Sequence, residues 1–225
     1  MQQRLLKQIA AIVFSIILSL FGIIPSVNVY AYNYWPNNAK MINGPIGKVT
    51  VYDPSNLNNS TNCSYSYTDI VDFAVDDWND ASYNVNYEHV AYSIQQSHKV
   101  YYLLGNYGID PNSPPEATTL FYNTNGVQYV SNDGAPTGDY AYCIIRINNS
   151  LVGQYGYYNF DYTDYRAYVS LFAHELGHTI GLAHNNYENP QWYPVALMHE
   201  ALYRFGNSGI YQPQNDDISG ANLRY

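Results

Sequence analysis

The sequence predicts one α+β domain, and three observations support this prediction. Its 225 residues suffice for a single domain of ordinary size with a proper core. Short segments that alternate apolar and polar residues, typical of strands, gather in the middle of the chain. Segments with helical periodicity lie before and after this group, and strands grouped in this way are typical of the α+β class.

Residues 1–31 are predicted to be a signal peptide. Arg4 and Lys7 provide a short positive segment, residues 9–24 are apolar, and residues 29–31 suit cleavage by signal peptidase. The alternative is an N-terminal membrane anchor, but the apolar run is short for a span of about 20 residues. We therefore expect a secreted, extracellular chain that forms one domain over residues 32–225.

The chain is acidic and rich in tyrosine. Its formal net charge of -9 would become -11 on loss of residues 1–31, because that segment holds two basic residues and no acidic ones. A surface of this charge repels phosphate, which argues against a nucleic-acid partner. The 27 tyrosines are expected mainly on half-buried strands, with their hydroxyls turned to water.

The two cysteines, Cys63 and Cys143, are expected to form a disulfide, because the chain is predicted to enter an oxidising compartment. A closed loop of about eighty residues would stabilise the fold by about 3–5 kcal/mol in the chain-entropy model. Only one pairing is possible, but the sequence does not show that the two sulfur atoms meet.

The first expected elements are a strand over residues 48–52 and a helix over residues 68–81. The apolar side chains of this helix share one stripe: Ile70, Ala74, Trp78 and Ala81. Four of its acidic side chains share the other side: Asp69, Asp72, Asp76 and Asp80. This pattern is typical of an amphipathic helix, so the acids are expected to form a solvated face rather than a metal site.

Further strands are expected after this helix, separated by glycine, asparagine and proline. They cover residues 83–90, 99–104, 118–123, 127–130 and 141–147. A second long helix is expected from residue 163 or 164 to about residue 181, and a short last helix over residues 215–223. The apolar stripe that should pack the long helix on the sheet comprises Tyr165, Val169, Phe172, Leu176 and Ile180.

The long helix carries a metal-binding pattern, which reads His-Glu-Leu-Gly-His-Thr-Ile-Gly-Leu-Ala-His over residues 174–184. His174 and His178 lie one turn apart, so both imidazoles leave the same helix face and can bind one ion. Glu175 lies about 100° around the helix and can reach a water on that ion without binding the ion itself.

The end of this pattern supplies a third ligand. Gly181 can adopt positive φ and end the helix, which lets the chain turn back with His184. Three neutral imidazoles leave the fourth position of a tetrahedral zinc open. The alternative is a helix with chance histidines, but all five specified positions of H-E-x-x-H-x-x-G-x-x-H are matched.

This pattern resembles that of the metzincin metalloproteases, whose signature adds a methionine-containing turn beneath the zinc. Ala196-Leu197-Met198 resembles that turn in the matrixins, the family of the matrix metalloproteinases. Asn215-Asp216-Asp217-Ile218-Ser219-Gly220 resembles the opening of the last matrixin helix. The specific likeness covers residues 164–225, and residues 141–148 more loosely resemble the strand before the active-site helix.

The resemblance implies a twisted, mostly parallel sheet with an active-site helix, a helix near the N-terminus and a C-terminal helix. It implies hydrolysis of peptide bonds through a zinc-activated water, with Glu175 as general base. The implied ligands of Zn²⁺ are His174, His178 and His184.

Residues near the C-terminus have supporting roles in this resemblance. Met198 is expected beneath the metal, although a methionine is more often a core packer. Asp216 or Asp217 is expected to tie the last helix to the methionine turn, although acids here also suit a helix N-terminus. Ca²⁺ is a further expected ligand, because the loop with Asp133 and Asp139 offers hard oxygen atoms; a solvated turn explains either residue alone.

The chain departs from the matrixins in three respects. No Pro-Arg-Cys-Gly-Val segment precedes the domain, which argues against latency through a thiolate. Only His89 and His98 lie upstream, too few for a second, structural zinc. Met198 is followed by His199-Glu200, where matrixins commonly have Tyr-Pro and where serralysins and astacins place a tyrosine second. We therefore expect a divergent, bacterial relative.

The expected function is that of a secreted zinc metalloendopeptidase acting on proteins or peptides, such as those of an extracellular matrix. We expect a monomer with no nucleic-acid partner and no stable membrane association after signal cleavage. The alternative is a non-catalytic, zinc-stabilised binding module or an inactive relative. Glu175 argues against this alternative, because a structural metal site does not need that acid. A tyrosine-rich adhesion protein would explain the composition but not the motif.

Overall fold

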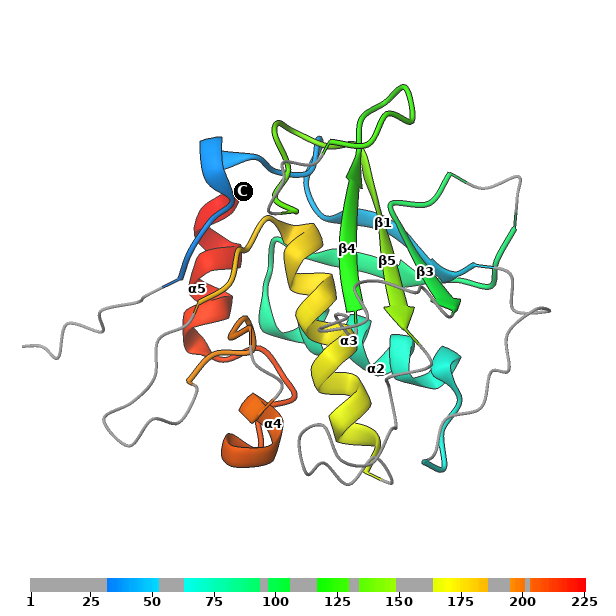
Figure 1. Ribbon diagram of the computed structural model, residues 1–225, viewed down its shortest axis with the longest axis vertical. Coiled ribbons are helices and arrows are strands. Elements are labelled where there is room, and N and C mark those ends of the chain that lie inside the picture. Colours follow the sequence, from blue (N-terminus) through cyan, green and yellow to red (C-terminus); the bar gives the residue numbers. More distant parts are fainter. Residues whose placement is uncertain are drawn as a thin grey trace, which may run out of the picture. The chain divides into compact units, whose positions relative to one another are not determined.

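The computed structural model describes residues 32–52, 63–93, 97–105, 117–129, 134–148, 164–185, 195–200 and 203–225. These residues form an α+β fold with a five-stranded, mostly parallel sheet and four α-helices (Figure 1). The predicted α+β class is thus confirmed. The predicted signal peptide lies outside this part of the chain. None of the described helices is long and apolar enough to cross a bilayer.

The sheet has the strand order β2-β1-β3-β5-β4. Its strands are β1 (Ile46–Val51), β2 (Asn86–His89), β3 (Val100–Gly105), β4 (Ala117–Tyr122) and β5 (Tyr142–Asn148). All neighbouring pairs are parallel except β4 and β5, so the edge strand β4 runs against the others. β4 lies at the edge of the sheet, where it pairs with β5 on one side and also contacts α3.

One predicted strand is wrong. Over residues 127–129, the described part of the expected strand 127–130, Gln128 makes only an isolated bridge to Tyr122. The side chain of Asn123 accepts hydrogen bonds from the backbone N–H groups of Asn125 and Val127. These bonds form a tight turn directly after β4, a conformation that asparagine side chains favour.

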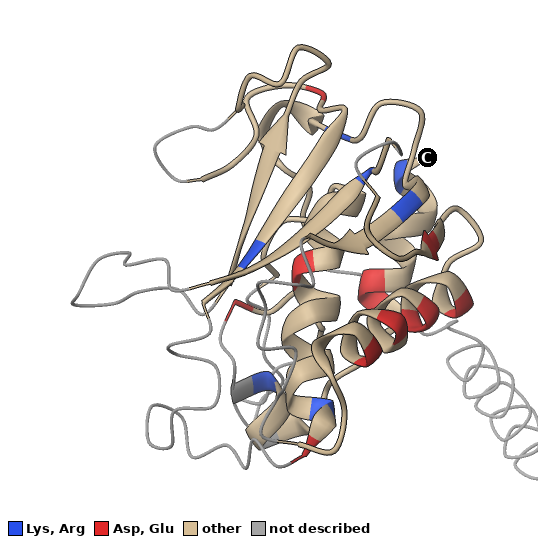
Figure 2. Cartoon of the chain, turned by 90° about the vertical axis from the view of Figure 1, so that its right-hand side faces the viewer, with Lys and Arg blue, Asp and Glu red and all other residues tan. Residues whose placement is uncertain are grey.

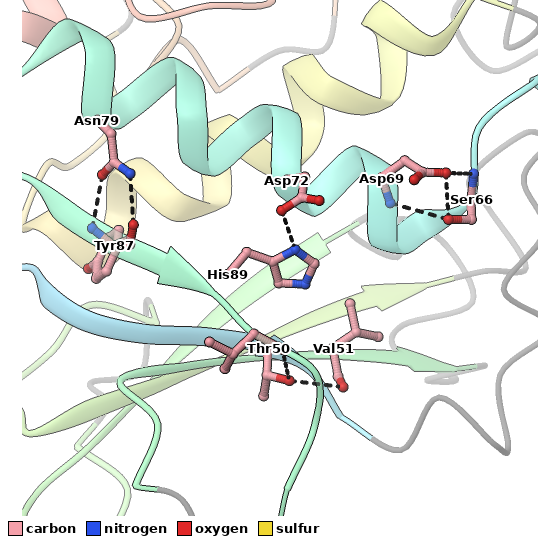
Figure 3. Close-up of polar contacts among 9 residues, drawn as sticks. Thr50, Val51, Ser66, Asp69, Asp72, Asn79, Tyr87 and His89 are labelled. Atoms are coloured by element: carbon pink, nitrogen blue, oxygen red, sulfur yellow. Dashed lines mark hydrogen bonds and ion pairs between the residues drawn. The ribbon is translucent and has the colours of Figure 1, made fainter.

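The helices are α2 (Tyr67–Ala81), α3 (Tyr165–Ile180), α4 (Tyr203–Ser208) and α5 (Asn215–Arg224). The sequence predicted α2, α3 and α5 to within two residues at each end. α4 was not expected, because six residues are too few to show helical periodicity. α2 begins at a capping box in which Ser66 and Asp69 exchange side-chain and backbone hydrogen bonds (Figure 3).

α2 confirms the predicted division into an apolar and an acidic side. Ile70, Ala74 and Trp78 are fully buried. The four acids of the other side are exposed, and Figure 2 shows them along one side of the helix. Asp72 also contacts His89 of β2, with its carboxylate 2.6 Å from Nδ1 (Figure 3).

The core lies between one face of the sheet and the helices α2 and α3 (Figure 1). Two polar side chains of the core hydrogen-bond to the backbone of α3. The indole N–H of Trp78 donates to the carbonyl of Ala173 on α3 at 2.8 Å. The hydroxyl of Tyr102 on β3 donates to the carbonyl of Phe172 at 3.0 Å. These bonds fix α3 relative to both α2 and the sheet.

The predicted disulfide is also wrong, because Cys63 and Cys143 are not bonded to each other. Cys143 lies on β5 with its side chain fully buried in the core, and burial raises the pKa of its thiol. Cys63 is half-buried in the segment before α2, where its Sγ lies 3.8 Å from the carbonyl oxygen of Tyr65. The fold thus places the two cysteines in different surroundings, which a count of cysteines cannot show.

Candidate metal centre

α3 is bounded as the sequence predicted. The carboxylate of Asp164 accepts a hydrogen bond from the backbone N–H of Arg166 and caps the first turn. Gly181 has φ 102°, a left-handed conformation that ends the helix after Ile180. The chain reverses there, so the predicted role of Gly181 is confirmed.

This reversal brings His174, His178 and His184 together. The Nε2 atom of His184 lies 3.3 Å from Nε2 of His174 and 3.2 Å from Nε2 of His178. One ring nitrogen from each of the three lies within 4.8 Å of the others, the only such group of possible ligands found in the described part of the chain. The three histidines could therefore hold a metal ion.

Backbone carbonyls fix the tautomers of the two helical histidines. Nδ1 of His174 lies 2.8 Å from the carbonyl oxygen of Leu197, and Nδ1 of His178 lies 2.8 Å from that of Leu182. A carbonyl oxygen can only accept, so each Nδ1 carries the hydrogen and each Nε2 carries a lone pair. Burial keeps both rings neutral, lowering the pKa of His174 well below its usual value and that of His178 to about 3.

Three nitrogen lone pairs directed at one point repel each other unless a cation lies between them. Nδ1 of His184 lies 3.7 Å from a carboxylate oxygen of Glu200, which favours hydrogen on Nδ1 and leaves Nε2 of this ring a lone pair too. A tetrahedral ion with nitrogen ligands at about 2.0–2.1 Å separates those ligands by roughly 3.3–3.4 Å. The observed distances of 3.2 and 3.3 Å fit such an ion.

The loop that carries His184 is held by the N-terminal segment. The side chain of Asn33 donates from Nδ2 to the carbonyl of His184 at 2.8 Å. The backbone carbonyl of Asn33 accepts a hydrogen bond from the N–H of Ala183. Trp35 donates from its indole to the carbonyl of His178, and its ring lies 4.9 Å from the ring of that histidine. The side chain of His184 is nevertheless 42% exposed, so one side of the centre is open to solvent.

Glu175 lies on the same helix turn but is not a member of the histidine group. Its side chain is buried, and its Oε2 atom lies 2.7 Å from the hydroxyl of Thr119 on β4. Burial raises the pKa of this carboxyl to about 7, opposed by the hydrogen bond from Thr119 and the charge of Arg204. A carboxyl of this pKa can accept and release a proton near neutral pH.

The methionine turn lies under α3 and is held by Asp217. The carboxylate of Asp217 accepts hydrogen bonds from the backbone N–H groups of Leu197 at 2.8 Å and Met198 at 3.1 Å. It also accepts from the N–H of Gln214 at the start of α5. The carbonyl of Leu197 in turn contacts His174. The expectation that one acid of the pair ties the last helix to this turn is confirmed, for Asp217.

We expect Asp217→Asn to lower the free energy of unfolding by about 1.5–3 kcal/mol, the range for hydrogen bonds to a charged group. An asparagine has one acceptor oxygen, whereas both oxygens of Asp217 are used and the residue is buried. Asp216→Asn is the matched control, because its asparagine oxygen can still accept from Asn185. Urea unfolding of both variants measures the difference, and equal stabilities would contradict this role.

Gly177 lets the methionine turn approach the helix. A Cβ atom placed on Gly177 would overlap the sulfur of Met198 and lie 2.9 Å from Cζ2 of Trp78. The turn and α2 therefore pack directly against the backbone of α3, where no side chain fits.

We predict that Gly177→Ala destabilises the fold by about 1–3 kcal/mol, as overpacking of a core does, despite the higher helix propensity of alanine. Gly138→Ala is the control, because a Cβ at Gly138 meets no atom within 4 Å. Thermal unfolding of both variants tests the prediction, and an unchanged or raised Tm for Gly177→Ala would refute it.

The structure brings together the four site residues that the sequence predicted, which are His174, Glu175, His178 and His184. Reasoning from the sequence missed Thr119, which lies 56 positions before Glu175 in no recognisable motif. It also missed the buried Arg204, which donates to the carbonyls of His199 and Ser170 and so joins α4 to α3 and to the residue that follows Met198. No local pattern marks either residue, because both contacts depend on packing.

Comparison with protein families and with curated proteins adds no relative from which a role could be taken. No family model matches the chain, and no curated protein matches it. The interpretation of the centre therefore depends on its own geometry.

Proposed function

We propose that this chain is a secreted zinc endopeptidase with a matrixin-like metzincin fold. The observation that supports the proposal most strongly is the centre itself, in which three neutral histidines converge beside a buried carboxylate. The sheet with its antiparallel edge strand, the helix α3 and the methionine turn tied to α5 are compatible with that fold.

The three Nε2 atoms of His174, His178 and His184 would hold the zinc ion. All three donors are imidazole nitrogens, which suit zinc, and no carboxylate belongs to the group. When bound, zinc would supply a Lewis acid that polarises the scissile carbonyl and lowers the pKa of a water to about 7.

Glu175 would act as the general base and then as the general acid. Its carboxylate, adjacent to the ligands but not one of them, takes a proton from the attacking water and passes it to the leaving amine. Its burial raises its pKa to about 7. This mechanism needs no acyl-enzyme, which agrees with the absence of a nucleophile motif in the sequence.

The proposed substrates are proteins or peptides, and the proposed state is a monomer outside the cell. We also retain calcium as a proposed stabilising ion. Asp139 accepts a hydrogen bond from the backbone N–H of Lys40, whereas Asp133 lies outside the described residues.

A peptide-library digest by the secreted chain, with and without a chelator, tests the proposed function. We expect cleavage at internal peptide bonds, loss of cleavage with the chelator, and recovery after addition of zinc. A chain that binds zinc but cleaves no peptide would instead favour the zinc-stabilised binding module. A chain that binds no zinc would overturn both interpretations.

A further inference from the structure

Thr119 lies where the edge strand β4 meets α3. It pairs with Ile145 of β5, and opposite residues of antiparallel strands point to the same face of a sheet. Ile145 is fully buried on the helix-covered face, and Thr119 is only 6% exposed. Its hydroxyl oxygen lies 2.7 Å from Oε2 of Glu175 and 3.1 Å from the carbonyl oxygen of the same residue.

The hydroxyl has one hydrogen to donate, and its two acceptors are not equivalent. A carboxylate oxygen is the stronger acceptor, and the contact to Oε2 is also the shorter one. The β-branched side chain of threonine has few rotamers, so the strand fixes the position of this hydroxyl oxygen. Oε2 is therefore held in one place at small cost in side-chain entropy.

The other carboxylate oxygen of Glu175 has a different environment. Oε1 accepts no hydrogen bond from any residue that the structure describes. The two oxygens are thus distinguished, one held by Thr119 and one left to accept a proton.

We infer that Thr119 is a positioning residue that fixes the carboxylate of Glu175 so that Oε1 accepts the proton of the attacking water. This inference rests on the proposed peptidase function. Thr119 does not touch the reacting atoms and acts only through Glu175. A residue that merely satisfied a buried polar group would affect stability but not turnover.

Three variants test the inference in the zinc-loaded full chain. Thr119→Val removes the hydroxyl at nearly constant shape, and we expect kcat to fall roughly ten- to hundredfold, the equivalent of one hydrogen bond to a charged group. KM and zinc content should stay the same. Thr119→Ser restores the donor and should recover kcat to within about threefold of the parent, given the added rotamer freedom of serine. Thr118→Val is the matched control, because within the described part of the chain the hydroxyl of Thr118 bonds only to the carbonyl of Ala117.

The kinetics of the Thr119 variants decide whether Thr119 positions Glu175 or only stabilises the fold. A Thr119→Val variant with the kcat of the parent, or a Thr119→Ser variant as slow as Thr119→Val, would overturn the inference. If the parent itself cleaves nothing, the proposed function has failed, and unfolding still tests the contact. A double-mutant cycle of Thr119→Val and Glu175→Met should then give non-additive shifts in the urea midpoint, whereas additive shifts would overturn the contact itself.

Discussion

Glu175→Gln should lower kcat for peptide hydrolysis by about 10²–10⁴-fold, the usual cost of removing a general base. Glutamine keeps the length of the side chain and can still accept a hydrogen bond from Thr119, but it cannot take up the proton of a water. The histidines are untouched, so zinc content should equal that of the parent. Stability should change little, because the substitution removes an ionisable group from a buried site.

The measurement combines steady-state kinetics on one peptide with elemental analysis of the purified protein. Glu88→Gln serves as the matched control, because Glu88 is exposed on β2 and the chemical change is identical. Cleavage by Glu175→Gln at close to the parental rate would refute the assigned base. Loss of zinc from the same variant would show that the carboxylate binds the ion.

His178→Ala should lose both the metal and the activity. This substitution removes one of the three nitrogen atoms that could bind the ion, so only His174 and His184 remain as possible ligands. Loss of a residue that only hydrogen-bonds to a metal ligand lowers metal affinity by roughly 10–100-fold. We expect loss of a ligand itself to lower zinc affinity by more than this. Competition with a chromogenic chelator measures the affinity, and the peptide assay measures turnover.

The histidine variant also has a natural control in the same chain. His89→Ala removes an imidazole that contacts Asp72 of α2, away from the three ligands. This variant should keep one zinc per chain. Zinc content in His178→Ala equal to that of the parent would rule out the ligand set, because all three nitrogens are needed for the site as we propose it.

Together the two substitutions separate metal binding from proton transfer. His178→Ala should abolish both zinc binding and turnover, whereas Glu175→Gln should abolish turnover alone. A protein in which neither variant affected cleavage would owe its activity to another site.

Local periodicity determined much of the fold. The apolar stripe of α2 and the long pattern that ends at Gly181 repeat every three to four residues, so each helix is visible within its own segment. The spacing of His174, Glu175 and His178 is a property of one helix, and backbone geometry alone puts the two imidazoles on one face. The sequence therefore predicted these three residues of the centre without knowledge of the sheet.

Contacts between distant segments could not be predicted in this way. Three features depend on how the strands and helices pack. Cys143 is not bonded to Cys63, the hydroxyl of Thr119 lies beside Glu175, and Asp217 rather than Asp216 holds the methionine turn. Each involves residues that share no periodic pattern along the chain.

The sequence by itself thus determined the helix that carries the centre and the three histidines that can meet at one point. Only the tertiary structure decided which carbonyls fix their tautomers and which donor holds the carboxylate of Glu175. The physical reason is that the positions of His174, Glu175 and His178 follow from the repeat of a single helix. The hydrogen bonds that orient His174 and Glu175 come instead from the methionine turn and β4, which only packing brings to α3.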